Sequence, residues 1–170
     1  EKMGVANMLQ REEEMLHLIF GRLSKIENIE ILEADKNDRL GVVSFIVQGA
    51  HYNLIVKLLN DRFGIQTRGG CACAGTYGHM LLHVDEIRSY EVLESIHSGN
   101  LSCKPGWVRL SVHPVMTNAE IVFILDAIEV TAANFKTWQQ DYVYNAQTNE
   151  YTYKGPADAV GEMIEAWFEL

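Results

Sequence analysis

The sequence lacks the hallmarks of several protein classes. Its 170 residues contain no apolar run long enough to cross a bilayer. Basic residues are scarce: 14 lysines and arginines against 23 acidic residues give a formal net charge of −9, which argues against nucleic acid as a partner. Only three cysteines are present, two of them one residue apart, and these do not make a disulfide framework. We therefore expect a reduced, cytoplasmic protein with no membrane or nucleic-acid partner.

The chain also lacks internal repeats and low-complexity linkers, and 48% of its residues are hydrophobic, enough to bury a single core. It begins without an initiator methionine, directly in the amphipathic pattern Glu1-Lys2-Met3. We interpret this start as that of a piece of a longer protein.

Helical and strand patterns alternate along the chain, with short connections between them. Helices are expected over residues 5–26, 53–63, 86–97 and from 118 onward, and strands over 28–33, 42–47 and 107–112. This order predicts an α+β fold, in which helices cover mainly one face of a small sheet. We divide the chain into a domain of residues 1–135 and a C-terminal extension of residues 136–170, which comprises a hairpin at 142–153 and a helix at 157–168.

The most heavily punctuated stretch runs from Arg68 to Tyr77 and reads RGGCACAGTY. Its glycines permit backbone conformations and close approaches that other residues forbid. A thiol becomes nucleophilic beside positive charge or backbone N–H groups, which stabilise its thiolate form. Cys73 is therefore our candidate catalytic nucleophile, with Cys71 as an accessory neighbour. The alternative is that Cys73 is an ordinary loop cysteine.

A zinc site is the competing interpretation of the same stretch. Cys71, Cys73, His79 and His83 form Cys-x-Cys followed by His-x-x-x-His, and all four are permitted zinc ligands. The first spacing is tight, because zinc knuckles more often have two residues between their cysteines. We therefore predict no metal and assign His79 an accessory role, as a hydrogen-bonding group near the site.

Arg109 lies in the middle of an otherwise apolar strand pattern, Trp107 to Val112. A charge in that position is costly unless it meets an anion, and the planar guanidinium matches a carboxylate in bidentate geometry. The alternative is an arginine that points into solvent. We expect the Arg68 and Arg109 stretches to face one ligand.

Three motifs occur in one order: GIQTRGGCAC at residues 64–73, KPGWVRLS at 104–111 and TNAEI at 117–121. In this order and spacing the chain resembles the C-terminal small domain of class V aminotransferase-fold enzymes, from about residue 42 to 128. These are pyridoxal-phosphate-dependent enzymes of fold type I, and the group includes cysteine desulfurases and selenocysteine lyases. The resemblance implies a homodimer and a small amino-acid substrate such as cysteine.

The resemblance also implies roles for individual residues. Cys73 resembles the desulfurase cysteine that takes the substrate sulfur as a persulfide, and a sulfur-acceptor protein is then a possible partner. Arg109 resembles the arginine that binds the α-carboxylate of the substrate, and Arg68 a second arginine near it. One departure stands out: that desulfurase branch has a histidine pair where this chain has Cys71 and Ala72.

The cofactor lysine of the family lies in a preceding large domain, in a segment of the Ser/Thr-x-His-Lys type. None of the seven lysines of this chain lies in such a segment. We therefore expect pyridoxal 5′-phosphate in the intact parent enzyme but not covalently bound to this chain alone. Two alternatives stay open: an aminotransferase or lyase without sulfur chemistry, and a non-catalytic α+β module that binds zinc or a protein.

Overall fold

The computed structural model describes residues 4–36, 38–71 and 75–155. Along the chain its elements are α1 (Val5–Leu23), β1 (Ile29–Ile31), β2 (Val42–Val47), α2 (Tyr52–Phe63), β3 (Arg68–Gly70), α3 (Gly75–Leu81), α4 (Glu86–His97), β4 (Trp107–Ser111), α5 (Asn118–Trp138), the 3-10 helix η1 (Gln139–Asp141), β5 (Tyr142–Asn145) and β6 (Glu150–Tyr153).

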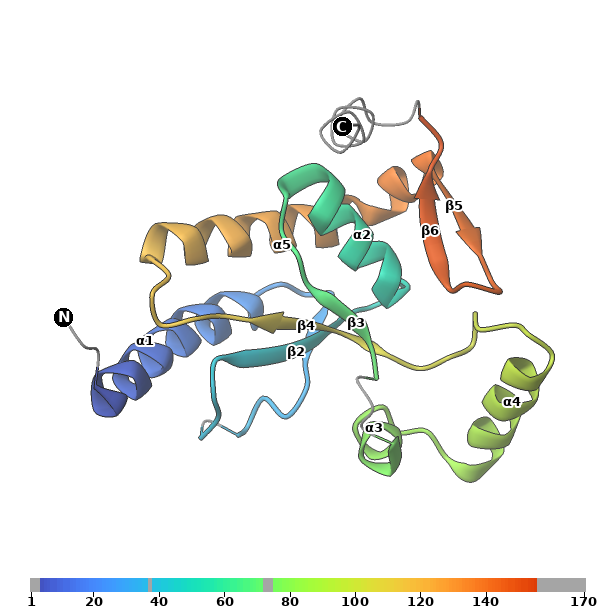
Figure 1. Cartoon of the computed structure of the whole chain (residues 1–170), viewed down its shortest axis with the longest axis horizontal. Coiled ribbons are helices and arrows are strands. Elements are labelled where there is room, and N and C mark those ends of the chain that lie inside the picture. Colours follow the sequence, from blue (N-terminus) through green and yellow to red (C-terminus); the bar gives the residue numbers. More distant parts are fainter. Residues whose placement is uncertain (1–3, 37, 72–74, 156–170) are drawn as a thin grey trace, which may run out of the picture.

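One antiparallel sheet organises the body of the molecule, with strand order β1-β2-β4-β3. The helices α1, α2 and α5 pack together over one face of it (Figure 1). Alternate residues of the two central strands enter this core, as the two-residue period of a strand requires. They are Val43, Phe45, Val47, Val108 and Leu110. The predicted α+β class, with helices mainly on one face, is confirmed.

Local sequence signals set the ends of several helices. A capping box begins α5, where Thr117 Oγ1 accepts from the Glu120 amide at 3.2 Å and Glu120 accepts in return from the Thr117 amide at 2.7 Å. Asp85 caps α4 by accepting from the Arg88 amide at 2.8 Å. Gly64 ends α2 in the left-handed conformation, with φ of 68°.

The glycine-rich stretch differs from the loop that we expected. Its first residues, Arg68–Gly70, form the edge strand β3, and Gly75–Leu81 form the helix α3, where only a short apolar segment was expected at 80–82. The strand forms because Gly69 has no side chain: a Cβ there would lie 2.9 Å from Cδ2 of Tyr52 on α2. Gly70 has a φ of 107°, which only glycine adopts readily. This close approach between β3 and α2 was not visible as a strand pattern in the sequence.

The predicted C-terminal hairpin is present as β5 and β6, and it packs against α2. Tyr142 donates to Asp61 of α2 at 3.1 Å. The helix α5 continues to Trp138, through the boundary that we placed between residues 135 and 136. That division stays a prediction, and the helix predicted at 157–168 lies outside the described residues.

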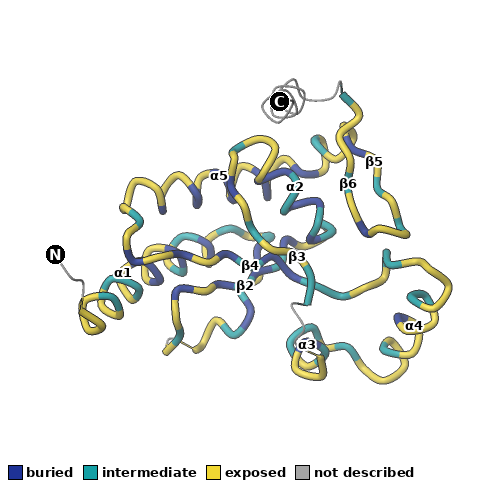
Figure 2. The backbone as a smooth tube through the Cα atoms, viewed as in Figure 1, coloured by how far each residue is buried: buried dark blue, intermediate teal, exposed yellow. Residues whose placement is uncertain are grey.

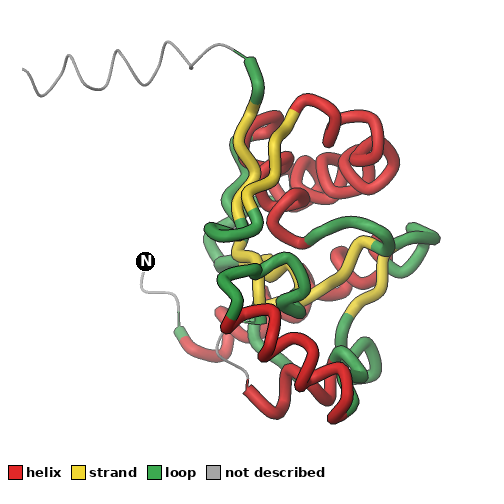
Figure 3. The backbone as a smooth tube through the Cα atoms, turned by 90° about the vertical axis from the view of Figure 1, so that its right-hand side faces the viewer, coloured by secondary structure: helices red, strands yellow, loops and turns green. Residues whose placement is uncertain are grey.

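Between β3 and β4 the chain leaves the body to form α3 and α4. Most of α4 is exposed (Figure 2), including the large side chains of Ile87, Tyr90 and Leu93. The hairpin and α4 lie at the same end of the molecule (Figures 1 and 3). Within the described residues, the helices are too short or too polar to span a bilayer.

Replacing Gly69 by alanine should destabilise the fold, because the new Cβ meets Tyr52 and Oδ1 of Asn53. We expect the free energy of unfolding to fall by about 2 kcal/mol, as for overpacking of a core. Gly21→Ala in α1 is the matched control, since no atom lies within 4 Å of its added Cβ and alanine favours a helix over glycine by roughly 1 kcal/mol. Urea unfolding followed by circular dichroism measures both, and equal stability of the two variants would contradict the close approach.

Candidate functional site

The second face of the sheet, opposite α1, α2 and α5, carries a row of polar side chains. In the antiparallel register Arg68 of β3 lies opposite Arg109 of β4, and Ser44 of β2 lies opposite Arg109 on the other side. Residues directly opposite one another project from the same face of a sheet. The three side chains therefore start side by side across three strands. The two stretches that we expected to face one ligand are thus adjacent strands.

A cavity of about 350 Å³ lies over two members of this row, Ser44 and Arg109, whereas Arg68 is not among its lining residues. Its lining residues come from the sheet face, from α3 and from the segment that joins β1 to β2. They are Leu32, Glu33, Lys36, Arg39, Ser44, Tyr77, Leu81, Trp107 and Arg109. The short helix α3 therefore forms one wall of a space whose floor is the Arg109 strand.

Two buried donors of β4 have no hydrogen-bond partner in the part of the chain that the structure describes. They are Nε of Arg109 and Nε1 of Trp107, whose side chain is only 4% exposed. A buried donor without an acceptor costs about 1–3 kcal/mol. Both residues belong to the same face of the same strand and both line the cavity. An acceptor bound there would remove this cost.

The other cationic side chains of the cavity are already engaged. Arg39 donates from Nε to the Lys36 carbonyl at 2.7 Å and from Nη2 to the Glu33 carbonyl. Its guanidinium also lies 4.9 Å from the centre of the Phe20 ring. Lys36 Nζ pairs with Asp35 at 2.9 Å. Within the described residues, neither Arg68 nor Arg109 forms an ion pair. Of the cationic side chains that line the cavity, Arg109 is therefore the one without a hydrogen-bond or ion-pair partner in the part of the chain that the structure describes.

The predicted thiol site is described only in part. Cys73 lies outside the described residues. Cys71 is half-buried and directly follows β3, so it is close in sequence to Arg68 and to the start of the site. Its accessory role stays a prediction.

The histidines lie elsewhere than we expected. His79 is on α3, and it lines a different hollow, of about 750 Å³, together with His83 and residues of α4. It does not line the Arg109 cavity. Among the described residues, no three His, Cys, Asp or Glu side chains are grouped to hold a metal ion. The accessory role of His79 stays a prediction.

Sequence reasoning overlooked Trp107, Ser44 and Tyr77. The strand period carries a signal for the first, because Trp107 and Arg109 are two residues apart and must share a face. Ser44 is the one polar residue in the apolar run of β2, and this exception is a sequence signal for a residue of the site. Tyr77 had no such signal, because its place in the cavity depends on how α3 folds back over the sheet.

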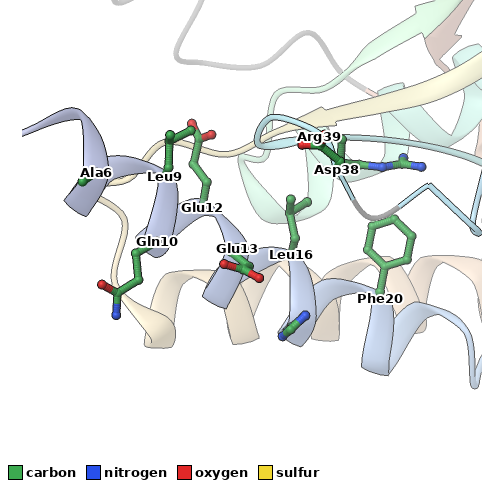
Figure 4. A pocket seen from close by; sticks show the side chains of 10 residues that line it. Ala6, Leu9, Gln10, Glu12, Glu13, Leu16, Phe20, Asp38 and Arg39 are labelled. Atoms are coloured by element: carbon green, nitrogen blue, oxygen red, sulfur yellow. The ribbon is translucent and has the colours of Figure 1, made fainter.

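A larger hollow, of about 580 Å³, lies between α1 and the segment at Asp38 and Arg39 (Figure 4). Leu9, Leu16 and Phe20 form its apolar wall, and the carboxylates of Glu12, Glu13 and Asp38 also belong to its lining. Its arginine is the engaged Arg39. Its three carboxylates would repel an anion, so the Arg109 cavity is the better candidate.

The described residues do not fit covalent attachment of pyridoxal phosphate. A Schiff-base lysine must supply a neutral amine. Lys36, the lysine of the cavity, is exposed, and its hydrogen bond to Asp35 raises the pKa of its amine. The cavity offers a place for a carboxylate rather than an amine for the cofactor.

Comparison with known proteins agrees with this arrangement of strands and helices. The family described as aminotransferase class-V matches residues 1–123, well over half of the chain. A search of curated proteins found no match. The matched region includes the arginine row, the glycine-rich strand and the start of α5. The chain belongs to the class V aminotransferase family.

Proposed function

We propose that this chain supplies the substrate-carboxylate site of a pyridoxal-phosphate-dependent enzyme that acts on a small amino acid. The observation that carries the proposal is the buried, unpartnered Nε of Arg109 in a cavity of about 350 Å³. Family membership supplies the class of enzyme. Arg109 binds the α-carboxylate by donating hydrogen bonds from its guanidinium, and the Trp107 indole donates a further hydrogen bond to the same ligand.

Electrostatics supports the same assignment. Arg68 and Arg109 lie opposite each other on adjacent strands, and like charges in that position repel. A bound carboxylate between them replaces this repulsion by attraction and by charge-assisted hydrogen bonds. The repulsion is tolerated because an anion occupies the site during function. Arg68, the more exposed of the two, acts as the outer arginine that draws the substrate in.

The cofactor belongs to another part of the intact enzyme in this proposal. The family depends on pyridoxal phosphate, which supplies an electron sink for amino-acid chemistry. Since no lysine of the cavity fits the Schiff base, we assign the cofactor lysine to a region that precedes these residues. The contribution of this chain is to bind and orient the substrate by its carboxylate.

For the reaction itself we propose a cysteine desulfurase with Cys73 as the sulfur acceptor. The balanced outcome is that free cysteine and the Cys73 thiol give alanine and a persulfide on Cys73. The resemblance of the Arg68-to-Cys73 spacing to one desulfurase branch supports this proposal. The second candidate is transamination or another lyase reaction without sulfur transfer. One observation favours it, namely that Cys71 and Ala72 stand where that branch has two histidines.

Replacing Arg109 by alanine in the intact, cofactor-loaded enzyme should lower kcat/KM for the amino acid by about a hundredfold, mainly through KM, because a charge-assisted pair with the substrate is lost. Steady-state kinetics measures the effect. Arg88→Ala is the matched control, since Arg88 is exposed on α4 and pairs with Glu91 at 2.8 Å. Equal kinetics of the two variants would remove the role assigned to Arg109.

The sulfur step is tested by comparing the two thiols in the same intact enzyme. Cys73→Ser should abolish sulfide release from cysteine while the cofactor absorbance stays intact, because the sulfur acceptor alone is lost. Cys71→Ser should have the milder effect. Alanine and sulfide are quantified together. A wild-type enzyme that holds its cofactor but makes no sulfide would move the assignment to the second candidate.

Without a ligand, Arg109 should cost stability. Arg109→Met removes the repulsion with Arg68 and the unpartnered Nε, so we expect the free energy of unfolding to rise by about 1 kcal/mol. Arg22→Met is the control, because Arg22 pairs with Asp126 at 2.7 Å and Glu129 at 2.6 Å and has no such cost. Urea unfolding of the ligand-free chain compares them. A loss of stability in Arg109→Met would show that the charge serves the fold instead.

A further inference from the structure

The C-terminal hairpin lies beyond residue 123, where the family match ends, and its tip holds a buried polar residue. Asn149 is 8% exposed and has a φ of 61°, a left-handed conformation that asparagine tolerates better than most residues. Its side chain donates to Tyr52 Oη at 2.7 Å and accepts from Tyr144 Oη at 2.8 Å. Its carbonyl accepts from Asn53 Nδ2 at 2.6 Å. The hairpin tip is therefore joined to the start of α2 by two hydrogen bonds.

Tyr52 connects this network to the candidate site. One edge of its ring faces β3: a Cβ on Gly69 would lie 2.9 Å from Cδ2, and one on Gly70 would lie 3.9 Å from Cε2. The other edge faces Gly106, where a Cβ would lie 2.6 Å from Cε1. We define the excursion as the part of the chain between β3 and β4, residues 71–106. Gly70 directly precedes the excursion, and Gly106 is its last residue. The ring thus packs where the cysteine-bearing segment leaves the sheet and where the chain returns to it.

The ring has little freedom to shift. His51 stacks on it with ring centres 4.4 Å apart, and His51 Nδ1 accepts from the Asn53 amide at 3.1 Å. Burial raises the pKa of the Tyr52 phenol and lowers the pKa of His51, so both side chains are neutral near pH 7. A negative charge on Cys71 would raise the Tyr52 pKa further.

A second contact ties the hairpin to the far end of the excursion. The Leu101 amide donates to the Ala146 carbonyl in the hairpin turn at 2.7 Å. The turn itself is held by Asn145, whose side chain accepts from the Gln147 amide at 2.9 Å. The hairpin consequently contacts the excursion directly at Leu101 and indirectly, through Tyr52, at its two glycine ends.

We propose that the β5–β6 hairpin fixes the two ends of the excursion, at Gly70 and Gly106, beside the arginine row, with Asn149 and Tyr52 as positioning residues. The glycines at positions 69, 70 and 106 leave the backbone there without side chains to lock it. The Tyr52 ring takes over that task, and Asn149 fixes the ring by its hydroxyl. This role at the ends of the excursion does not depend on the reaction. Its effect on kcat rests on the proposed function.

The structural step is tested by amide hydrogen exchange on the chain without substrate or cofactor. Asn149→Gly keeps the left-handed backbone but removes the side chain, and Tyr52→Phe removes only the hydroxyl. Each should speed exchange at residues 69–71 and 104–107 by about tenfold, because one buried hydrogen bond is lost locally. Exchange in β1 and β2 should not change. Gln147→Ala, an exposed position in the same turn, is the matched control and should match wild type.

Unchanged exchange at residues 69–71 in both variants would overturn the proposal. Equal acceleration of exchange throughout the sheet would also overturn it, because that result indicates a purely global loss of stability. In the intact, cofactor-loaded enzyme, both variants should lower kcat about tenfold with KM for the amino acid unchanged, since Arg109 is untouched. A rise in KM alone would also contradict positioning of the segment. Local acceleration of exchange without desulfurase activity in wild type would retain the positioning role and reject the proposed reaction.

Discussion

The candidate site depends on the register between β3 and β4, which sets two arginines opposite each other on one sheet face. That register is possible because β3 packs against α2 through Gly69, where a side chain would collide with Tyr52. A shift by one residue would turn Arg68 toward the core and away from Arg109, since successive side chains of a strand alternate between faces. The glycines of the RGG stretch thus serve the site through packing as well as through backbone freedom.

Local signals accounted for much of the fold in advance. The Thr117–Glu120 capping box, the Asp85 cap and the Gly64 stop each act within a few residues, which is why the helix ranges expected from the sequence agree with the structure. The strand expected over residues 107–112 is likewise present, as β4. These features need no knowledge of distant segments.

What was not predictable depended on contacts between distant parts of the chain. Arg68–Gly70 reads as a loop, because two glycines weaken any strand pattern, and only its partner β4 makes it a strand. Asn149 and Tyr52 are 97 residues apart, and no local pattern indicates that they meet. Tyr77 enters the cavity only because α3 lies over the sheet. The family match ends at residue 123, inside α5. It therefore does not include the hairpin whose Asn149 bonds to Tyr52.

Both edges of the sheet are short, since β1 and β3 each contain three residues. Open strand edges are templates on which other chains can add a strand, and short edges offer few backbone groups for this pairing. At β3, glycines replace the apolar side chains that an invading strand would pack against, and Arg68 adds a charge that would have to be desolvated. The residues that shape an anion site therefore also protect the sheet from edge-to-edge aggregation.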